Sequence, residues 1–237
     1  MTKIITVGNK IVTSGNKIVT NIWSPYNIPG MKLWLRADAG VVKDGDNLVA
    51  EWQDQSGNDY HAEQGVQANK PLLVDVGVNG KPVLRFDGNQ VMLADFQQNF
   101  AQPNTFFVVW RDYDESRGCA FSTVSTNAVR LLSETDDRIV GNAGSALQFS
   151  GSNVKNSFVV STWVSNTTNS QLFENGIFKV SGNNGNNTVT RLLIGKLDGS
   201  SAYDLDGDIA EIIFYNSLLS DQQRQSVEQY LMAKYAL

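Results

Sequence analysis

The acidic residues of this chain lack the pairing that sugar hydrolysis requires. Hydrolysis of a glycosidic bond needs two carboxylates on either side of that bond. Asp112, Asp114 and Glu115 come nearest, but they lie in a turn-like stretch just after a predicted strand. Glu174 and Glu211 each stand alone in a predicted strand, where a single acid usually has a structural role. We therefore predict that the chain is not an enzyme.

Nucleophilic catalysis and zinc binding both have too few candidate residues. His61 is the only histidine, so it would have to supply the base of any Ser-His-Asp or Cys-His arrangement. Cys119 is the only cysteine, which excludes an intrachain disulfide and leaves zinc without several His or Cys ligands. We interpret Cys119, beside Ala120 and Phe121, as a small buried hydrophobe.

Calcium is the one metal for which the sequence offers ligands. Asp204, Asp206 and Asp208 alternate around Gly207, and oxygen-rich loops suit a hard cation. Their spacing does not match the EF-hand loop. The alternative is that Asp206 and Gly207 simply form a turn at the entry to a strand. We therefore predict no cofactor and keep these three aspartates as the candidate calcium ligands.

Aromatic residues in predicted loops are the candidates for binding a sugar. Tyr60, Tyr113 and Tyr203 lie in such loops and could form platforms for a glycan. Trp34 and Trp163, by contrast, lie in apolar predicted strands and are expected in the core. The sequence thus offers three tyrosines as glycan-binding residues, far apart along the chain.

Short alternating or apolar runs separated by turn residues predict an all-β fold. Asn175-Gly176 between two such runs is a strong hairpin signal. Ser220 and Gln223 have the spacing of a capping box and precede a helical pattern over 221–235. We expect an antiparallel two-sheet jelly-roll sandwich with one C-terminal helix. The predicted strands are 32–36, 81–86, 105–110, 158–163, 171–174, 177–180, 191–195 and 209–215.

The first 22 residues contain an internal repeat. The hexapeptide at 8–13 recurs at 15–20, and each copy begins with Gly-Asn, which favours a tight hairpin turn. We predict three short strands over 3–22 that are too few to be stable alone. They would serve assembly by packing on the main domain or on another subunit, unless the segment is a mobile arm. The residues expected to make these contacts are Ile4, Ile11, Ile18, Val12 and Val19.

Pro25, Pro29 and Gly30 mark a linker after this repeat, so we divide the chain into an arm and linker at 1–30 and a jelly-roll domain at 31–237.

The formal net charge is −5, and no basic run occurs. Binding to nucleic acid or to an anionic membrane is therefore not expected. No apolar stretch near Met1 has the form of a signal peptide.

Five short motifs occur in a characteristic order, at 33–38, 52–58 (W-x-D-x-S-G-N), 84–88, 193–195 and 207–216. In order and spacing they resemble the concanavalin A-like lectin/glucanase superfamily, in the laminin-G-like form found in phage and bacterial surface proteins. The resemblance implies a fold, while the function ranges from glycan binding and adhesion to hydrolysis and passive structural roles. The E-x-D-x-x-E strand of the hydrolase members is missing here.

These observations together favour a non-enzymatic structural or attachment protein of a virus particle, such as a phage capsid decoration or tail protein. Located in the virion, it would display the jelly roll and contact other virion proteins, sister subunits or a host surface glycan. A symmetric homo-oligomer is expected, with a trimer favoured. The alternative is a carbohydrate-binding, lectin-like module, and a glycoside hydrolase is the third hypothesis.

Overall fold

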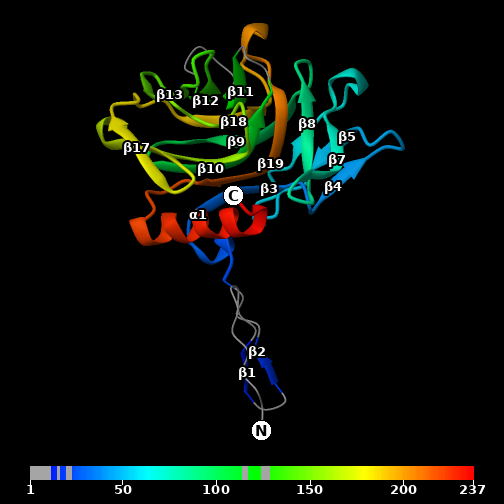
Figure 1. Ribbon diagram of the computed structural model, residues 1–237, viewed down its shortest axis with the longest axis horizontal. Coiled ribbons are helices and arrows are strands. Elements are labelled where there is room, and N and C mark those ends of the chain that lie inside the picture. Colours follow the sequence, from blue (N-terminus) through cyan, green and yellow to red (C-terminus); the bar gives the residue numbers. More distant parts are fainter. Residues whose placement is uncertain (1–11, 15–16, 20–22, 114–116, 124–128) are drawn as a thin grey trace.

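Two antiparallel β-sheets lie face to face in the computed structural model, which describes residues 12–14, 17–19, 23–113, 117–123 and 129–237 (Figure 1). The eight-stranded sheet has the order β17-β16-β15-β10-β19-β8-β7, and β3 also pairs with β19. Its strands are β3 (Met31–Arg36), β7 (Leu72–Val78), β8 (Lys81–Asp87), β10 (Asn104–Asp112), β15 (Val159–Ser165), β16 (Ser170–Glu174), β17 (Ile177–Gly182) and β19 (Asp206–Tyr215).

The nine-stranded sheet has the order β14-β13-β12-β11-β18-β9-β6-β5-β4. Its strands are β4 (Val41–Lys43), β5 (Val49–Trp52), β6 (Ala62–Glu63), β9 (Met92–Phe100), β11 (Gly118–Ser122), β12 (Val129–Ser133), β13 (Ile139–Ala143), β14 (Ala146–Phe149) and β18 (Val189–Ile194). All eight strands predicted from the sequence are present, and the predicted sandwich is confirmed. The other strands of these two sheets were missed.

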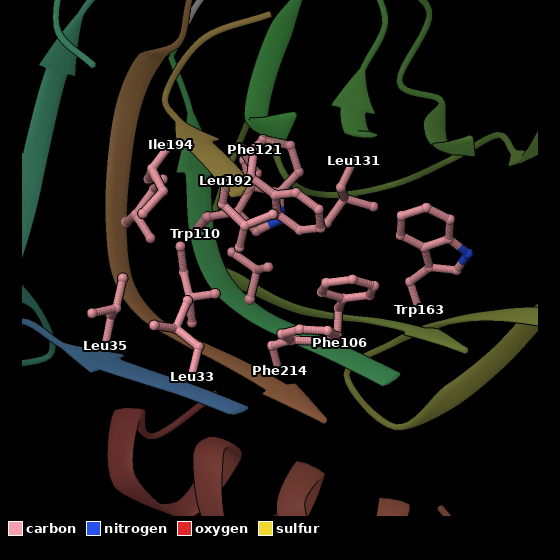
Figure 2. Close-up of a cluster of buried hydrophobic side chains, with 14 of the residues drawn as sticks. Leu33, Leu35, Phe106, Trp110, Phe121, Leu131, Trp163, Leu192, Ile194 and Phe214 are labelled. Carbon is pink, nitrogen blue, oxygen red and sulfur yellow. The ribbon is translucent and has the colours of Figure 1, made fainter. Parts of the chain in front are cut away.

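The core between the sheets is built around aromatic side chains (Figure 2). The ring of Phe106 on β10 stacks on Phe214 of β19 at 4.7 Å and on Trp163 of β15 at 5.4 Å between ring centroids. Phe121 from the nine-stranded sheet closes on Phe106 at 5.0 Å. All four side chains are fully buried, so Trp163 forms part of the core, as predicted, and these rings are closely packed between the sheets.

Helix α1 (Asp221–Tyr235) covers the outer face of the eight-stranded sheet (Figure 1). Its buried Val227, Leu231 and Tyr235 belong to a second apolar cluster with strand residues such as Trp34 and Phe107. The predicted capping box is confirmed. In the described part of the chain, no helix is both long and apolar enough to cross a membrane.

The linker before β3 is more ordered than its prolines predicted. A short 3-10 turn, η1 (Pro25–Asn27), forms here with Ser24 as its cap. Pro25 suits this turn because proline is favoured at the first position of a helix. The hydroxyl of Tyr215 donates to the carbonyl of Pro25 at 2.7 Å, and Trp23 lies 6.1 Å from Tyr230 of the helix. The linker is therefore fastened to the sandwich.

The N-terminal repeat forms a hairpin of β1 (Val12–Ser14) and β2 (Lys17–Val19), which stands apart from the sandwich in Figure 1. The two strands pair with Val12 opposite Val19, as the predicted register requires. The first predicted strand, with Ile4, and also Ile11, lie outside the described residues. Packing of the hairpin on the main domain is not seen, and the assembly role and the division into domains stay predictions.

Candidate functional site

The outer face of the nine-stranded sheet is covered in one part and open in another. Over β11 to β13 it is covered, because Leu197 and Tyr203 from the loop after β18 pack on Cys119, Leu132 and Val140. Burial raises the pKa of the Cys119 thiol, as expected for the inert small hydrophobe that was predicted. Over β6, β9 and β18 the same face carries a hollow of about 650 Å³, which we call the β9 hollow.

The β9 hollow has an apolar floor and polar walls. Leu93 on β9 and Leu193 on β18 are register partners and form the floor together with Val91. Around them stand carboxylates, amides and an imidazole: Asp59, His61, Glu63, Gln64, Asp95 and Gln97, with Gly65. The sheet register places this mixture, because Ala62 pairs with Ala94 and Glu63 with Leu93.

A bulge in β9 forms one wall of the hollow. Arg191 pairs with Asp95 and Val189 with Phe100, so residues 96–99 of β9 lie opposite residue 190 alone. Within the bulge Gln97 has φ +51°, a left-handed conformation that glutamine seldom adopts. Its backbone N–H donates to Asp95 Oδ1 at 2.9 Å. Bulges re-aim side chains, and this one places Gln97 in the lining of the hollow.

The opposite wall rests on the W-x-D-x-S-G-N loop. Asp54 is buried and accepts the backbone N–H of Trp34 at 2.8 Å and that of Ser56 at 2.9 Å, which ties the loop to β3. The N–H of Asp54 donates to His61 Nδ1 at 3.1 Å, so the imidazole is fixed with Nε2 3.9 Å from Glu51 Oε1. The polar side chains of the loop thus have a structural role, and the loop also positions His61 in the wall.

The chemistry of the β9 hollow suits a hydroxyl-rich ligand. Glu63 and Asp95 are exposed carboxylates that can accept hydroxyl protons, and the Gln97 amide can both donate and accept. The leucine floor offers contact for the C–H groups of a ring. A few polar groups that converge over an apolar floor are typical of small-molecule sites.

The structure does not bring the three predicted glycan-binding tyrosines together. Tyr60 lies behind the β9 hollow, edge-on to Phe96 at 5.1 Å, and its hydroxyl accepts a hydrogen bond from Gln98. Tyr203 packs into the cluster that covers β11 to β13 and lies 5.1 Å from the Arg117 guanidinium.

Tyr113 lies on the eight-stranded sheet instead. Its hydroxyl donates to Asp208 and accepts from Arg85 at 2.9 Å and from Arg111 at 2.5 Å. Burial raises its pKa, and the hydrogen bond to Asp208 raises it further. A shared aromatic platform is therefore not formed by these tyrosines, and their individual roles in glycan binding stay predictions.

The three aspartates proposed for calcium do not form a metal site. Asp204 lies 2.8 Å from Lys196, while the buried Asp208 lies 2.8 Å from Arg85 and 3.7 Å from Arg111. Asp206 is exposed at the start of β19, opposite Asp87. Across the described residues no group of three His, Cys, Asp or Glu side chains could hold a metal ion. Asp204 and Asp208 thus pair with cations, which the sequence spacing could not reveal.

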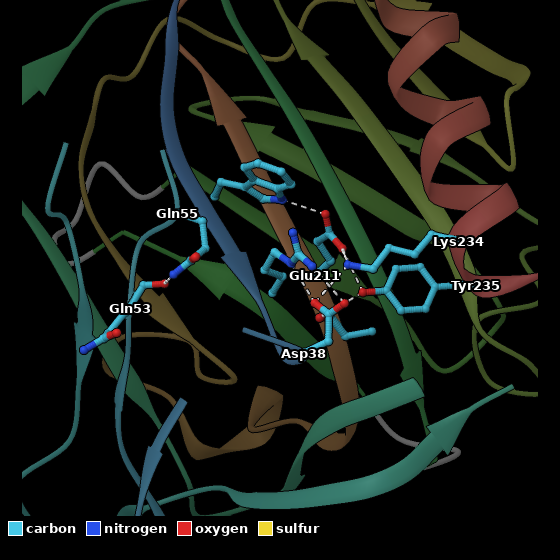
Figure 3. Close-up of polar contacts among 9 residues, drawn as sticks. Asp38, Gln53, Gln55, Glu211, Lys234 and Tyr235 are labelled. Carbon is cyan, nitrogen blue, oxygen red and sulfur yellow. Dashed lines mark hydrogen bonds and ion pairs between the residues drawn. The ribbon is translucent and has the colours of Figure 1, made fainter. Parts of the chain in front are cut away.

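The other acids considered as catalytic candidates have structural partners. Glu211 accepts from Trp34 Nε1 and Lys234 Nζ, both at 2.6 Å, and from the Tyr235 hydroxyl at 2.8 Å (Figure 3). Glu174 accepts from Ser152. Asp112 is buried 3.1 Å from Lys155, while Asp114 and Glu115 lie outside the described residues.

Solved structures similar to this chain include toxin binding domains and a sialidase. The chain is similar to the binding domain of Paraclostridial Mosquitocidal Protein 1 (TM-score 0.64, 15% identity, 90% of this chain and 53% of that chain). It is similar to the receptor-binding domain of botulinum neurotoxin D (TM-score 0.61, 14% identity, 88% and 54%). It is also similar to the Trypanosoma rangeli sialidase in complex with the inhibitor DANA (TM-score 0.59, 12% identity, 85% and 33%).

These likenesses show the fold: the chain is a β-sandwich of the jelly-roll kind. It spans about half the length of the two toxin domains and a third of the sialidase chain. The sequence matches no protein-family model, and a search of the curated proteins finds no match.

The β9 hollow itself was not predicted from the sequence. Its residues come from three separate segments, 59–65, 91–97 and Leu193, which only the strand pairing brings together. The available signal was the polar run 97–99, between the apolar residues Phe96 and Phe100 of one strand. Such an interruption is typical of a bulge.

Proposed function

We propose that this domain is a non-catalytic carbohydrate-binding module of the concanavalin A-like, lectin-like type, and that it binds its glycan in the β9 hollow. The observation that carries the proposal is the hollow itself: carboxylate, amide and imidazole groups stand around two leucines on an uncovered sheet face. Sugars present both hydroxyls and an apolar C–H face, and the hollow has partners for each.

The similar structures support the class of ligand. One of them is the botulinum neurotoxin D ligand-binding domain in complex with N-acetylneuraminic acid (TM-score 0.59, 13% identity, 86% of this chain and 51% of that chain). At this identity only the fold is shared, so the likeness supports recognition of carbohydrate on such a sandwich. It does not name the sugar.

Binding without hydrolysis fits the setting of the acids better than catalysis does. Glu63 on β6 pairs with Leu93 of β9, two residues before Asp95, so the two acids lie on the same face of neighbouring strands, and both are exposed to water. A catalytic acid needs burial or neighbouring charge to keep its proton near neutral pH. We expect no new reducing ends when the protein is incubated with polysaccharides. Hydrolysis that Glu63→Gln abolishes would contradict the proposal.

A glycan array followed by titration calorimetry tests the proposal. We expect binding to at least one glycan, with the same affinity in EDTA, because the described residues hold no metal-binding group. Asp95→Asn should weaken that binding by roughly tenfold, as loss of a charge-assisted hydrogen bond does. The matched control is Asp75→Asn, another exposed strand aspartate on the other sheet, and it should leave affinity unchanged.

Two outcomes would contradict carbohydrate binding in the β9 hollow. One is the absence of binding across a broad array. The other is binding that Asp95→Asn and Asp75→Asn affect equally. Circular dichroism of each variant confirms that the fold is retained.

Attachment to a virion stays a second proposal, with the β1–β2 hairpin as the feature that favours it. This hairpin stands apart from the sandwich and pairs only within itself in the sheet topology of the described residues (Figure 1). The solved structures reported above are toxin domains and a sialidase, so they lend the virion no support. Deletion of residues 1–22 should abolish assembly and leave the sandwich folded. An unchanged number of subunits in the native assembly after deletion would refute the role of the hairpin.

A further inference from the structure

The β9 hollow is strongly acidic. Its lining includes three carboxylates, Asp59, Glu63 and Asp95, and in the described part of the chain none of its lining residues is lysine or arginine. Arg191, the backbone partner of Asp95, is not among the lining residues. The charged groups that line the hollow are therefore carboxylates, and a bound ligand would meet a predominantly negative field.

We infer that the β9 hollow takes uncharged or amino sugars and discriminates against sialic acid and other acidic sugars. This inference rests on the proposed function and goes beyond it by naming the charge class of the ligand. It separates this chain from the botulinum neurotoxin D domain, whose complex contains N-acetylneuraminic acid.

Hydrogen-bond chemistry supports the same choice. An ionised carboxylate only accepts hydrogen bonds, so it pairs with a sugar hydroxyl or an ammonium group but has no donor for a sugar carboxylate. His61 and the amides of Gln64 and Gln97 are the other polar side chains in the lining. The Gln64 amide is already engaged, because it donates to the Val91 carbonyl at 2.7 Å and accepts from the Val66 N–H at 2.9 Å.

The size of the discrimination follows from Coulomb's law. One unit charge about 7 Å from another in water changes affinity roughly two- to threefold. Three carboxylates acting together should therefore weaken binding of an acidic sugar by roughly tenfold, and salt should reduce this effect. A glucosamine unit should gain by a similar factor over its N-acetylated form.

An acidic sugar has a better match elsewhere on the surface. A smaller hollow of about 260 Å³ is lined by Arg111 together with Asn79, Asn156 and Ser157. The positive charge of Arg111 provides what the lining of the β9 hollow lacks. Binding of a sialylated glycan that is lost in Arg111→Gln but kept in Asp95→Asn would support the inference, because the acidic sugar would then avoid the β9 hollow.

Matched glycan pairs on an array, followed by titration, give the test. The pairs are N-acetyllactosamine with and without terminal sialic acid, and chitin oligomers with and without N-acetyl groups. We expect the sialylated form to bind about tenfold more weakly and the deacetylated oligomer more tightly. In the double variant Glu63→Gln/Asp95→Asn, the preference between members of each pair should fall to about threefold, while Asp75→Asn keeps it.

The outcomes separate this inference from the proposed function. Equal or tighter binding of the sialylated form overturns the charge selectivity and leaves carbohydrate binding intact. Preference for the uncharged form that the double variant does not change also overturns it, because the carboxylates would then not be its cause. The absence of binding to every glycan overturns the proposed function and this inference together.

Discussion

Glu211 lies in the middle of β19 with only 1% of its surface exposed, yet it faces the helix rather than a ligand. Its carboxylate binds Trp34, Lys234 and Tyr235, which come from β3 and from the last turn of α1 (Figure 3). Burial raises the pKa of Tyr235, and the charge of Glu211 raises it further, so the phenol remains a donor. A single acid thus joins the sheet to its covering helix.

We predict that Glu211→Gln lowers the free energy of unfolding by about 3 kcal/mol, because it removes one partner of a buried charge pair. In this variant Lys234 Nζ would keep its ion pair with Asp38 Oδ1 at 3.0 Å but would lose the buried carboxylate of Glu211. Urea denaturation measures the change. The control is Glu134→Gln, whose partner Arg117 is half exposed and whose loss should cost less than about 1 kcal/mol. Equal costs for both variants would contradict the role of Glu211.

Asp38 gives a prediction about pH. Burial alone would raise the pKa of its carboxyl, but hydrogen bonds and charges from Arg36 and Lys234 outweigh burial and lower the pKa below its ordinary value. The lowered pKa means that Asp38 stabilises the folded state above its unfolded pKa. This contribution is lost as the pH falls through the folded value.

We therefore expect Asp38→Asn to cost about 1 kcal/mol at pH 7 and progressively less below about pH 4. Thermal unfolding of wild type and variant between pH 7 and pH 2.5 measures the difference. A difference that stays constant over this range would show that the charge of Asp38 does not contribute.

At the scale of elements, the positions of α1 and of the β9 bulge determine which outer face of the sandwich is open to a ligand. The helix begins at a reciprocal capping box, in which Ser220 Oγ accepts from the Gln223 N–H at 3.3 Å and Gln223 Oε1 accepts from the Ser220 N–H at 2.9 Å. It occupies one outer face, which leaves the other for the hollow. The bulge at residues 96–99 of β9 then gives the outer face of the nine-stranded sheet its polar wall.

We predict that Ser220→Ala destabilises the protein by about 1 kcal/mol, because the first turn of the helix loses its side-chain cap. Ser226→Ala is the matched control. Ser226 lies inside the helix and donates to the Gln222 carbonyl at 2.8 Å. Alanine is the better helix former, so this control should be neutral or slightly stabilising. Urea denaturation of both variants gives the comparison, and a larger loss in Ser226→Ala would contradict the capping role.

At the scale of the whole molecule, sequence patterns predict the elements whose side chains alternate or carry turn and cap signals. The hairpin at Asn175-Gly176 has both residues at positive φ, +50° and +75°, which is why its sequence is diagnostic. Helix α1 has the predicted bounds. Strands such as β13, with Gly141 and Asn142 inside it, have no such pattern and are held by their neighbours.

The candidate site escaped prediction for a different physical reason. The sequence analysis predicted a glycan site from aromatic residues in loops. Tyr60 does lie next to the hollow, but its ring packs inward against Phe96. Leu93, Asp95 and Leu193 each read as ordinary strand residues, and only the pairing of β9 with β18 and β6 makes them one surface. Long-range register of this kind leaves no local signal in a single sequence.

Amide chemical shifts in solution test glycan binding in the β9 hollow most directly, because they map where a glycan identified on the array binds. We predict that saturation with the glycan perturbs the amides of Leu93, Asp95, Gln97 and Leu193, with little change on the helix-covered sheet. Perturbations centred on Tyr113 and Arg111, or on the β11–β13 cover around Tyr203, would contradict a binding site in the β9 hollow.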